Sequence, residues 1–142
     1  MKHVDVAIAV VARGADVLIC RRLEGTPFAG YWEFPGGKLE PGETLEQCVV
    51  RELAEEVGAI VAPEFTLPII EHTYPHARVR LHPFVCRLVD GEPRPIGCSE
   101  CRWIPAQRLA DFRFPPANNA LLADIIAHLA PGRDVVSDPA PG

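Results

Sequence analysis

The chain of 142 residues lacks any apolar run near the ~20 residues that a membrane-spanning helix needs. Its first residues, MKHVDVAIAVV, also lack a signal-peptide cleavage site and its usual flanks. No internal repeat is present, and the length suits one domain with its own core but is short for two. We therefore expect a single cytoplasmic domain over residues 1–130 that does not associate with a membrane.

The chain also lacks an excess of positive charge and a cysteine framework. Its formal net charge of −5 argues against a protein that binds duplex DNA through phosphate contacts. Five cysteines are an odd number, and their irregular spacing suits reduced thiols. Cys98 and Cys101 form a C-x-x-C pattern, but neither a second pair nor a histidine at finger-like spacing accompanies it. We interpret both as incidental thiols, with a zinc or redox site as the alternative.

The remaining patterns predict a mixed sheet between helical layers. One helix is predicted between the Pro41-Gly42 turn and Gly58, and a second one over residues 118–129, where leucine and isoleucine recur with helical period. Residues 24–34 are predicted to form a loop, and residues 131–142, rich in proline and glycine, a flexible tail. The first two predicted strands form a hairpin, and the next two form a second antiparallel pair. The strands are predicted at residues 3–12, 16–22, 65–74, 79–89 and 101–104.

The most densely charged segment contains Arg51, Glu52, Glu55 and Glu56. On a helix the three glutamates share one side, where neighbouring side chains approach within ~5–6 Å. Such carboxylates repel one another unless a cation lies among them, and their oxygens suit Mg²⁺ or Mn²⁺. Arg51, at the edge of this side, can orient a glutamate through paired N–H groups. The alternative interpretation is a solvated acidic face.

The segment as a whole resembles the Nudix box. Gly37, five residues, Glu43, seven residues and then the string from Arg51 to Gly58 match that pattern, and only small Ala59 departs from it. The resemblance implies an α/β Nudix fold, a mixed β-sheet sandwiched between helices (an α/β/α sandwich). It implies hydrolysis of a nucleotide with Mg²⁺, or Mn²⁺, as the cofactor. The residues that it implies for metal binding and catalysis are Gly36, Arg51, Glu52, Glu55 and Glu56, with Glu52 alternatively a general base.

From about Val4 to Leu129 the chain resembles the MutT-like branch of this family. That branch hydrolyses 8-oxo-dGTP to the monophosphate and pyrophosphate, and its Phe-Pro-Pro-Ala-Asn string ends here at Asn118. The asparagine reads the purine, whereas a pyrimidine-directed branch tends to carry aspartate. An amide both donates and accepts, so it can address the O6 and N7–H edge of 8-oxoguanine. The alternative role of Asn118 is to cap a helix.

The same resemblance implies further contacts with the nucleotide. We expect Arg22 and Lys38 to stabilise phosphate charge, and Phe34 either to stack on the base or to belong to the core. His76 departs from the branch, which has an acidic residue at this place. The expected substrate-binding residues are Arg22, Glu33, Phe34, Pro35, Gly36, Lys38, Tyr74, His76 and Asn118.

One departure concerns the metal site. MutT-like proteins usually carry another glutamate six residues before the tryptophan of a late strand, and here this position is Gly97. Glu100 is the nearest carboxylate, so it is a candidate ligand, with an exposed loop glutamate as the alternative.

These observations predict a metal-dependent nucleoside triphosphate diphosphatase that removes 8-oxo-dGTP from the nucleotide pool and so limits oxidative mutagenesis during DNA replication and repair. One alternative is another substrate, such as CTP or a methylated dCTP. A second alternative is a base-reading domain without catalysis. We expect a monomer whose partner is a small nucleotide and which forms no stable complex with nucleic acid.

Overall fold

The first strand, β1 (Lys2–Arg13), is apolar on both faces and lies inside the sheet of the computed structural model, which describes residues 1–129. It pairs in parallel with β7 (Ala77–Asp90) along almost its whole length. Its other edge pairs antiparallel with β4 (Gly36–Lys38) and β2 (Asp16–Arg21). Continuous burial is typical of a strand that is covered on both faces.

Four further strands complete the sheet within residues 1–129. β3 (Trp32–Glu33) and β8 (Glu100–Pro105) pair antiparallel with β2. β5 (Ile60–Thr66) and β6 (Ile70–Thr73) pair antiparallel with β7. The only parallel pair among the described strands is therefore β1 with β7, and the sheet is mixed.

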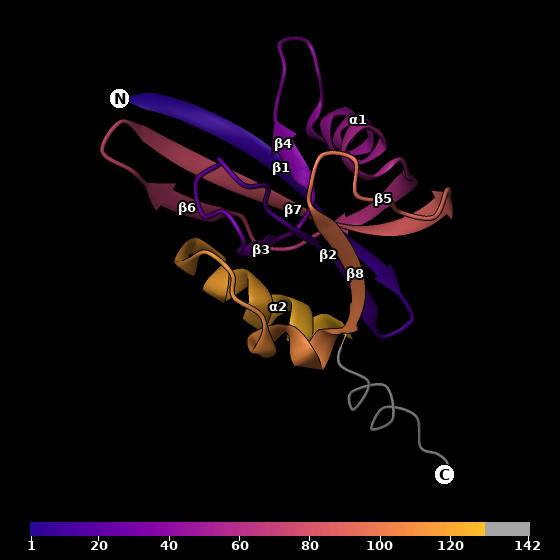
Figure 1. Ribbon diagram of the computed structural model, residues 1–142. Helices are drawn as coiled ribbons and strands as arrows, with labels where there is room; N and C mark the ends of the chain where they lie inside the picture. Colours follow the sequence, from indigo (N-terminus) through magenta and orange to yellow (C-terminus); the bar gives the residue numbers. More distant parts are fainter. Residues whose placement is uncertain (130–142) are drawn as a thin grey trace.

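Helices cover both faces of this sheet (Figure 1). Helix α1 (Leu45–Val57) packs against the odd-numbered side chains of β1, such as Ala9 and Val11. Helix α2 (Asn119–Leu129) and the short 3-10 helices η1 (Ala106–Asp111) and η2 (Pro116–Asn118) lie on the opposite face, with the even-numbered residues Ile8 and Val10. The predicted α/β/α sandwich is confirmed.

Both ends of α1 follow the turn and cap chemistry of the sequence. The Thr44 hydroxyl accepts a hydrogen bond from the Gln47 backbone N–H at 3.1 Å, and the Gln47 side chain accepts one from the Thr44 N–H at 2.9 Å. This reciprocal pair is a capping box. Gly58 ends the helix with φ of 69°, a left-handed conformation that glycine adopts without steric cost.

The structure corrects the predicted elements in three respects. The strand predicted over residues 65–74 is two strands, because residues 67–69 leave the ladder and Pro68 has no N–H to donate. β5 begins at Ile60, directly after α1, which the apolar pattern of the helix obscured. The loop predicted over residues 24–34 contains β3 near its end.

None of the helices within residues 1–129 is long and apolar enough to cross a membrane. The tail predicted over residues 131–142 lies outside the described residues.

Candidate functional site

Arg51 joins α1 to the loop that precedes it. Its guanidinium forms two contacts with the Glu43 carboxylate, at 2.5 and 3.0 Å, and donates to Glu52 at 3.0 Å and to Glu55 at 3.2 Å. It also donates to the backbone oxygen of Lys38 at 3.3 Å. Paired charge-assisted bonds of this kind fix orientation as well as supply energy. Arg51 therefore contacts two of the three glutamates and also holds Glu43, which was not among the predicted site residues.

The Glu52 carboxyl group lies against the α-carbon of Gly37. A Cβ atom built on Gly37 would meet the Glu52 Oε1 atom at 2.6 Å, closer than any ordinary contact. A Cβ atom on the preceding Gly36 would instead collide with the backbone of β1. The two glycines of β4 therefore have different roles: Gly36 lets two strands approach, and Gly37 leaves room for a carboxylate.

Glu56 is held on the same side of β4 by Gly36. Its Oε1 atom accepts a hydrogen bond from the Gly36 N–H at 3.1 Å. Glu33 lies close enough for a hydrogen bond between the two carboxyl groups, and it also forms a 2.6 Å ion pair with Arg22. Burial, together with the neighbouring Glu33, raises the pKa of Glu56 to about 8, and burial raises the pKa of Glu33. Ionisation of both half-buried carboxyl groups at once is therefore disfavoured.

The shortage of positive charge near Glu33 and Glu56 fits the binding of a divalent cation at this site. Carboxylates that repel one another in a buried site are stabilised when a hard cation lies among their oxygens. Within residues 1–129, no three carboxylate, imidazole or thiol groups converge as a complete ligand set. Glu52 and Glu55 are turned to Arg51, and the Glu55 side chain is 62% exposed. For all three glutamates to hold one cation, Glu55 would have to leave Arg51.

The position at which the resemblance predicts a glutamate lies directly behind Glu56. The Gly97 N–H donates to the backbone oxygen of Glu56 at 2.9 Å, and a Cβ atom on Gly97 would lie 3.3 Å from the Glu56 Cγ atom. Glu100 begins β8 and forms ion pairs with Arg102 at 2.8 Å and Arg21 at 3.8 Å. The Glu100 carboxylate is therefore already paired with two arginines.

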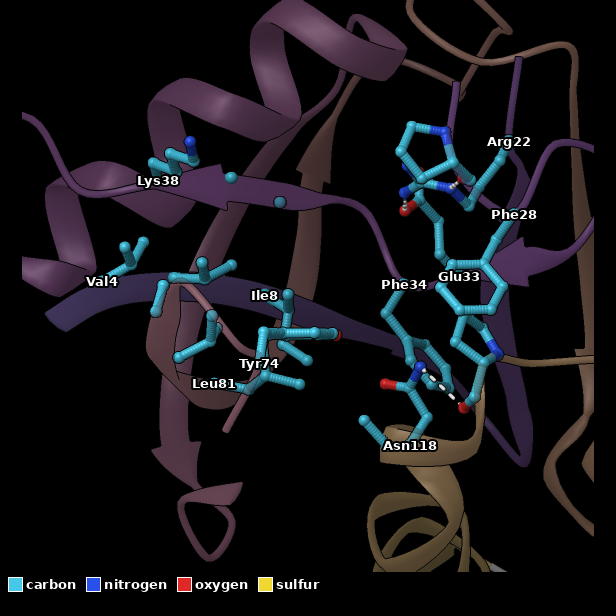
Figure 2. A pocket seen from close by; sticks show the side chains of 18 of the residues that line it. Val4, Ile8, Arg22, Phe28, Glu33, Phe34, Lys38, Tyr74, Leu81 and Asn118 are labelled. Carbon is cyan, nitrogen blue, oxygen red and sulfur yellow. Dashed lines mark hydrogen bonds and ion pairs between the residues drawn. The ribbon is translucent and has the colours of Figure 1, made fainter. Parts of the chain in front are cut away.

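A cavity of about 650 Å³ opens on the α2 side of β4 (Figure 2). Its floor is apolar because Val4 and Val6 of β1 are ladder partners of Val79 and Leu81 of β7. Turns and helix ends from distant parts of the chain form its walls. They contribute, among others, Arg22, Pro27, Phe28, Glu33, Phe34, Tyr74, His76, Pro115 and Asn118.

All but one of the expected substrate-binding residues line this cavity. The exception is Pro35, which is fully buried and accepts a hydrogen bond from the Ala9 N–H at 2.8 Å. Phe34 is only 4% exposed and stacks on Phe114, with ring centroids 5.2 Å apart, so it belongs to the core while it also borders the cavity. Pro27 and Phe28 line the cavity too, although the sequence of that loop carries no signal for it.

Asn118 lies at the end of η2 with its amide at the cavity wall. Its Nδ2 atom donates to the backbone oxygen of Pro115 at 3.4 Å. Because that oxygen only accepts, the amide nitrogen faces Pro115 and the amide oxygen points into the cavity (Figure 2). No backbone N–H within the described residues donates to the Asn118 side chain. The hydrogen bond by which Asn118 would cap a helix, its alternative role, is therefore absent within residues 1–129.

The thiols of Cys98 and Cys101 lie beside Cys20, with which Cys101 pairs across β2 and β8. The hydrogen bond from Cys20 lowers the pKa of Cys98, whereas burial raises the pKa of Cys101 to about 11. All five cysteines are free, and no cluster within residues 1–129 suits a metal. The interpretation of Cys98 and Cys101 as incidental thiols stays a prediction.

Comparison with known proteins agrees with this geometry. A family profile described as NUDIX domain matches residues 6–124. The chain is 35% identical over 127 residues to 8-oxo-dGTP diphosphatase of Escherichia coli, an overlap that covers 88% of this chain and 98% of that protein. It is 45% identical over 58 residues to CTP pyrophosphohydrolase of Escherichia coli, covering 41% of this chain and 43% of the other.

Similarity to solved structures agrees with the fold described above. The solution structure of the E. coli ORF135 protein superimposes with a TM-score of 0.80 at 27% identity, covering 99% of this chain and 96% of that one. The family profile spans both the charged segment of α1 and the strands that line the cavity. The chain therefore belongs to the Nudix family of hydrolases.

Proposed function

We propose that this protein hydrolyses 8-oxo-dGTP to 8-oxo-dGMP and pyrophosphate and thereby removes an oxidised nucleotide from the pool used for DNA synthesis. The observation that carries the proposal is the Asn118 amide, whose oxygen points into an apolar cavity. Oxidation converts N7 of guanine from an acceptor into a donor, so an amide oxygen at this place favours the oxidised base. The relatives named 8-oxo-dGTP diphosphatase support the same substrate.

Strand β4 gives the proposed substrate its orientation. Gly36 and Gly37 line the cavity on one side and contact Glu56 and Glu52 on the other. A base bound near Asn118 would thus extend its phosphates over these two glycines toward the carboxylates. Lys38, next in the strand, also lines the cavity and supplies a positive charge there.

The roles that we assign to the α1 residues follow from charge. Glu52, Glu55 and Glu56, with the Gly36 carbonyl, would hold Mg²⁺ or Mn²⁺, which supplies charge neutralisation and a lowered pKa for the attacking water. Arg51 keeps Glu52 against Gly37. Lys38 and Arg22 balance the charge that develops on the phosphates. Glu52 is alternatively the general base that accepts the proton of the water.

A substrate panel with Mg²⁺ tests the proposal. Turnover of 8-oxo-dGTP should be faster than that of dGTP or CTP, and the product should be pyrophosphate rather than orthophosphate. In ¹⁸O-labelled water, attack at the β-phosphorus places the label in pyrophosphate. Label in the monophosphate, or equal turnover of dGTP and 8-oxo-dGTP, would contradict the proposal.

CTP or a methylated dCTP is the second candidate substrate. It is favoured by the 45% identity with CTP pyrophosphohydrolase over 58 residues. The exocyclic amine of cytosine also donates, so it too could pair with the Asn118 oxygen. Faster turnover of CTP than of 8-oxo-dGTP in the same panel would select this candidate, and absence of any turnover would select a base-reading domain without catalysis.

A further inference from the structure

The turn between β6 and β7 holds Tyr74 at the cavity wall. The Tyr74 N–H donates to the Ala77 oxygen at 2.7 Å, and the Ala77 N–H donates back to the Tyr74 oxygen at 3.3 Å. Pro75, the next residue, has a φ angle fixed by its ring. The backbone of Tyr74 is thus restrained on both sides, which sets the direction in which its side chain leaves the turn.

Two imidazole rings restrain the aromatic ring of Tyr74. His72 meets it edge-on with ring centroids 4.4 Å apart, and His76 lies nearly parallel to it at 6.0 Å. Such contacts favour one orientation of the ring over its alternatives. A side chain fixed by both its turn and its neighbours has little rotational freedom left to lose when a ligand binds.

The Tyr74 hydroxyl is the polar end of a side chain in an otherwise apolar part of the cavity. Figure 2 draws the ring beside Ile8 and Leu81, with its hydroxyl end directed toward the side that holds Phe34 and Asn118. No hydrogen bond joins this hydroxyl to another residue in the described part of the chain. Since a phenolic O–H both donates and accepts, a ligand in the cavity can form a hydrogen bond with it in place of solvent.

We propose that the Tyr74 hydroxyl determines specificity by hydrogen-bonding the base edge opposite the one that faces Asn118. In guanine and 8-oxoguanine that edge carries the 2-amino group, whose N–H donates a hydrogen bond to the phenolic oxygen. A purine without this group leaves the hydroxyl unpaired, so the enzyme selects a 2-aminopurine base. The inference rests on the proposed function, because it requires a purine in this cavity.

The nucleotides dGTP and dITP form the matched pair of substrates, because they differ only in the 2-amino group. One neutral hydrogen bond corresponds to a factor of about 3 to 10 in affinity. The unsubstituted enzyme should therefore show a kcat/KM for dGTP about 3- to 10-fold above that for dITP. Tyr74→Phe keeps the ring and its contacts with His72 and His76 and removes only the hydroxyl, so it should bring this ratio to about 1.

Tyr31→Phe is the control, since Tyr31 is the other tyrosine of the chain and does not line the cavity. This variant should keep the dGTP/dITP ratio, and both variants should keep the melting temperature. An unchanged ratio in Tyr74→Phe would overturn the inference, as would an equal loss for dGTP and dITP, which would assign the hydroxyl to the sugar or the phosphates.

The proposed function and the proposed role of Tyr74 are tested by different measurements. The preference for the oxidised base is measured by 8-oxo-dGTP against dGTP, which differ at C8 and N7. The role of Tyr74 is measured by dGTP against dITP, which are identical at those atoms. A chain that hydrolyses dGTP and 8-oxo-dGTP equally but loses its preference over dITP in Tyr74→Phe would reject the first proposal and keep the second.

Discussion

The two sides of β4 are built in opposite ways. On the α1 side, charged groups from one continuous stretch, residues 43–56, are joined by ion pairs, and Glu56 accepts a hydrogen bond from the Gly36 N–H. On the α2 side, the cavity has an apolar floor and takes its walls from segments between Lys2 and Asn118. The comparison teaches that the proposed chemistry depends on local sequence, whereas the proposed recognition depends on how distant segments meet. Substitutions on the two sides should therefore change different kinetic quantities.

The largest effect is expected from Glu56→Gln. Glutamine keeps the shape of the side chain and can still accept the Gly36 N–H, but it removes a charged oxygen from the proposed cation site. We expect kcat to fall by about 10³-fold, with an unchanged melting temperature. Steady-state kinetics at saturating Mg²⁺ and thermal unfolding measure both quantities.

Glu46→Gln is the matched control for Glu56→Gln, because Glu46 lies exposed on the same helix. It should keep the parental rate. The unsubstituted protein should lose all turnover in excess chelator and regain it when Mg²⁺ is restored. Near-parental turnover by Glu56→Gln, or full turnover with chelator present, would refute the assignment of the carboxylates to a metal.

The second effect comes from Gly37→Ala, which tests whether the α1 side depends on the position of one carboxylate. The added methyl group would occupy the place of the Glu52 carboxyl, the movable end of a flexible side chain. The chain should fold and Glu52 should shift, so we expect kcat to fall by about 100-fold. Kinetics and the melting temperature, measured on the same preparation, separate a loss of catalytic rate from a loss of stability.

Gly36→Ala provides the contrast within the same strand. Its methyl group meets the backbone of Ala7 and Ile8, which cannot move without breaking the pairing of β1 and β4. This variant should lower the melting temperature far more than Gly37→Ala does. Equal loss of stability in the two variants would show that Gly37 serves the fold rather than Glu52.

The third effect, from Asn118→Ala, belongs to the cavity side. A polar mismatch at a buried contact costs ~1–3 kcal/mol, so the preference for 8-oxo-dGTP over dGTP should fall about 10-fold. The efficiency on dGTP should change less than that on 8-oxo-dGTP. If the ratio stays constant while the melting temperature falls, Asn118 is a structural residue and pyrimidine nucleotides become the preferred candidates.

The difference between the two sides also explains what could be predicted from the sequence. The spacing of Arg51 and the glutamates and the caps of α1 follow from helical period and turn residues, and the structure has both. These features involve residues close together in the chain. Local patterns are sufficient for them. The helical layers on both faces of the sheet were implied by the resemblance to Nudix proteins.

Contacts between distant segments could not be predicted from those local patterns. The parallel pairing of β1 with β7 joins residues about 75 positions apart and has no turn signal. The contribution of Pro27 and Phe28 to the cavity depends on the path of a loop, and the proximity of Glu33 to Glu56 depends on how β3 and α1 meet. Pro35 was expected at the substrate because the segment that leads into the Nudix box resembles that of MutT-like proteins, but its side chain is buried.

The smallest effect is expected from Glu43→Gln, which tests how firmly Arg51 ties the loop to α1. Hydrogen bonds from Arg51 lower the pKa of Glu43 from 4.5 to about 2. A carboxyl group whose pKa is depressed by folding stabilises the folded state above its ordinary pKa, and this stabilisation is lost as the pH falls through the folded-state value. The difference in melting temperature between the parental protein and Glu43→Gln should therefore be a few degrees above about pH 5 and should vanish toward about pH 2.

Glu46→Gln, measured over the same range, should track the parental protein at every pH. A difference that is constant from pH 7 to pH 2 would mean that Glu43 acts through its shape and not through its charge, and Arg51 would then owe its position to Glu52 and Glu55 alone.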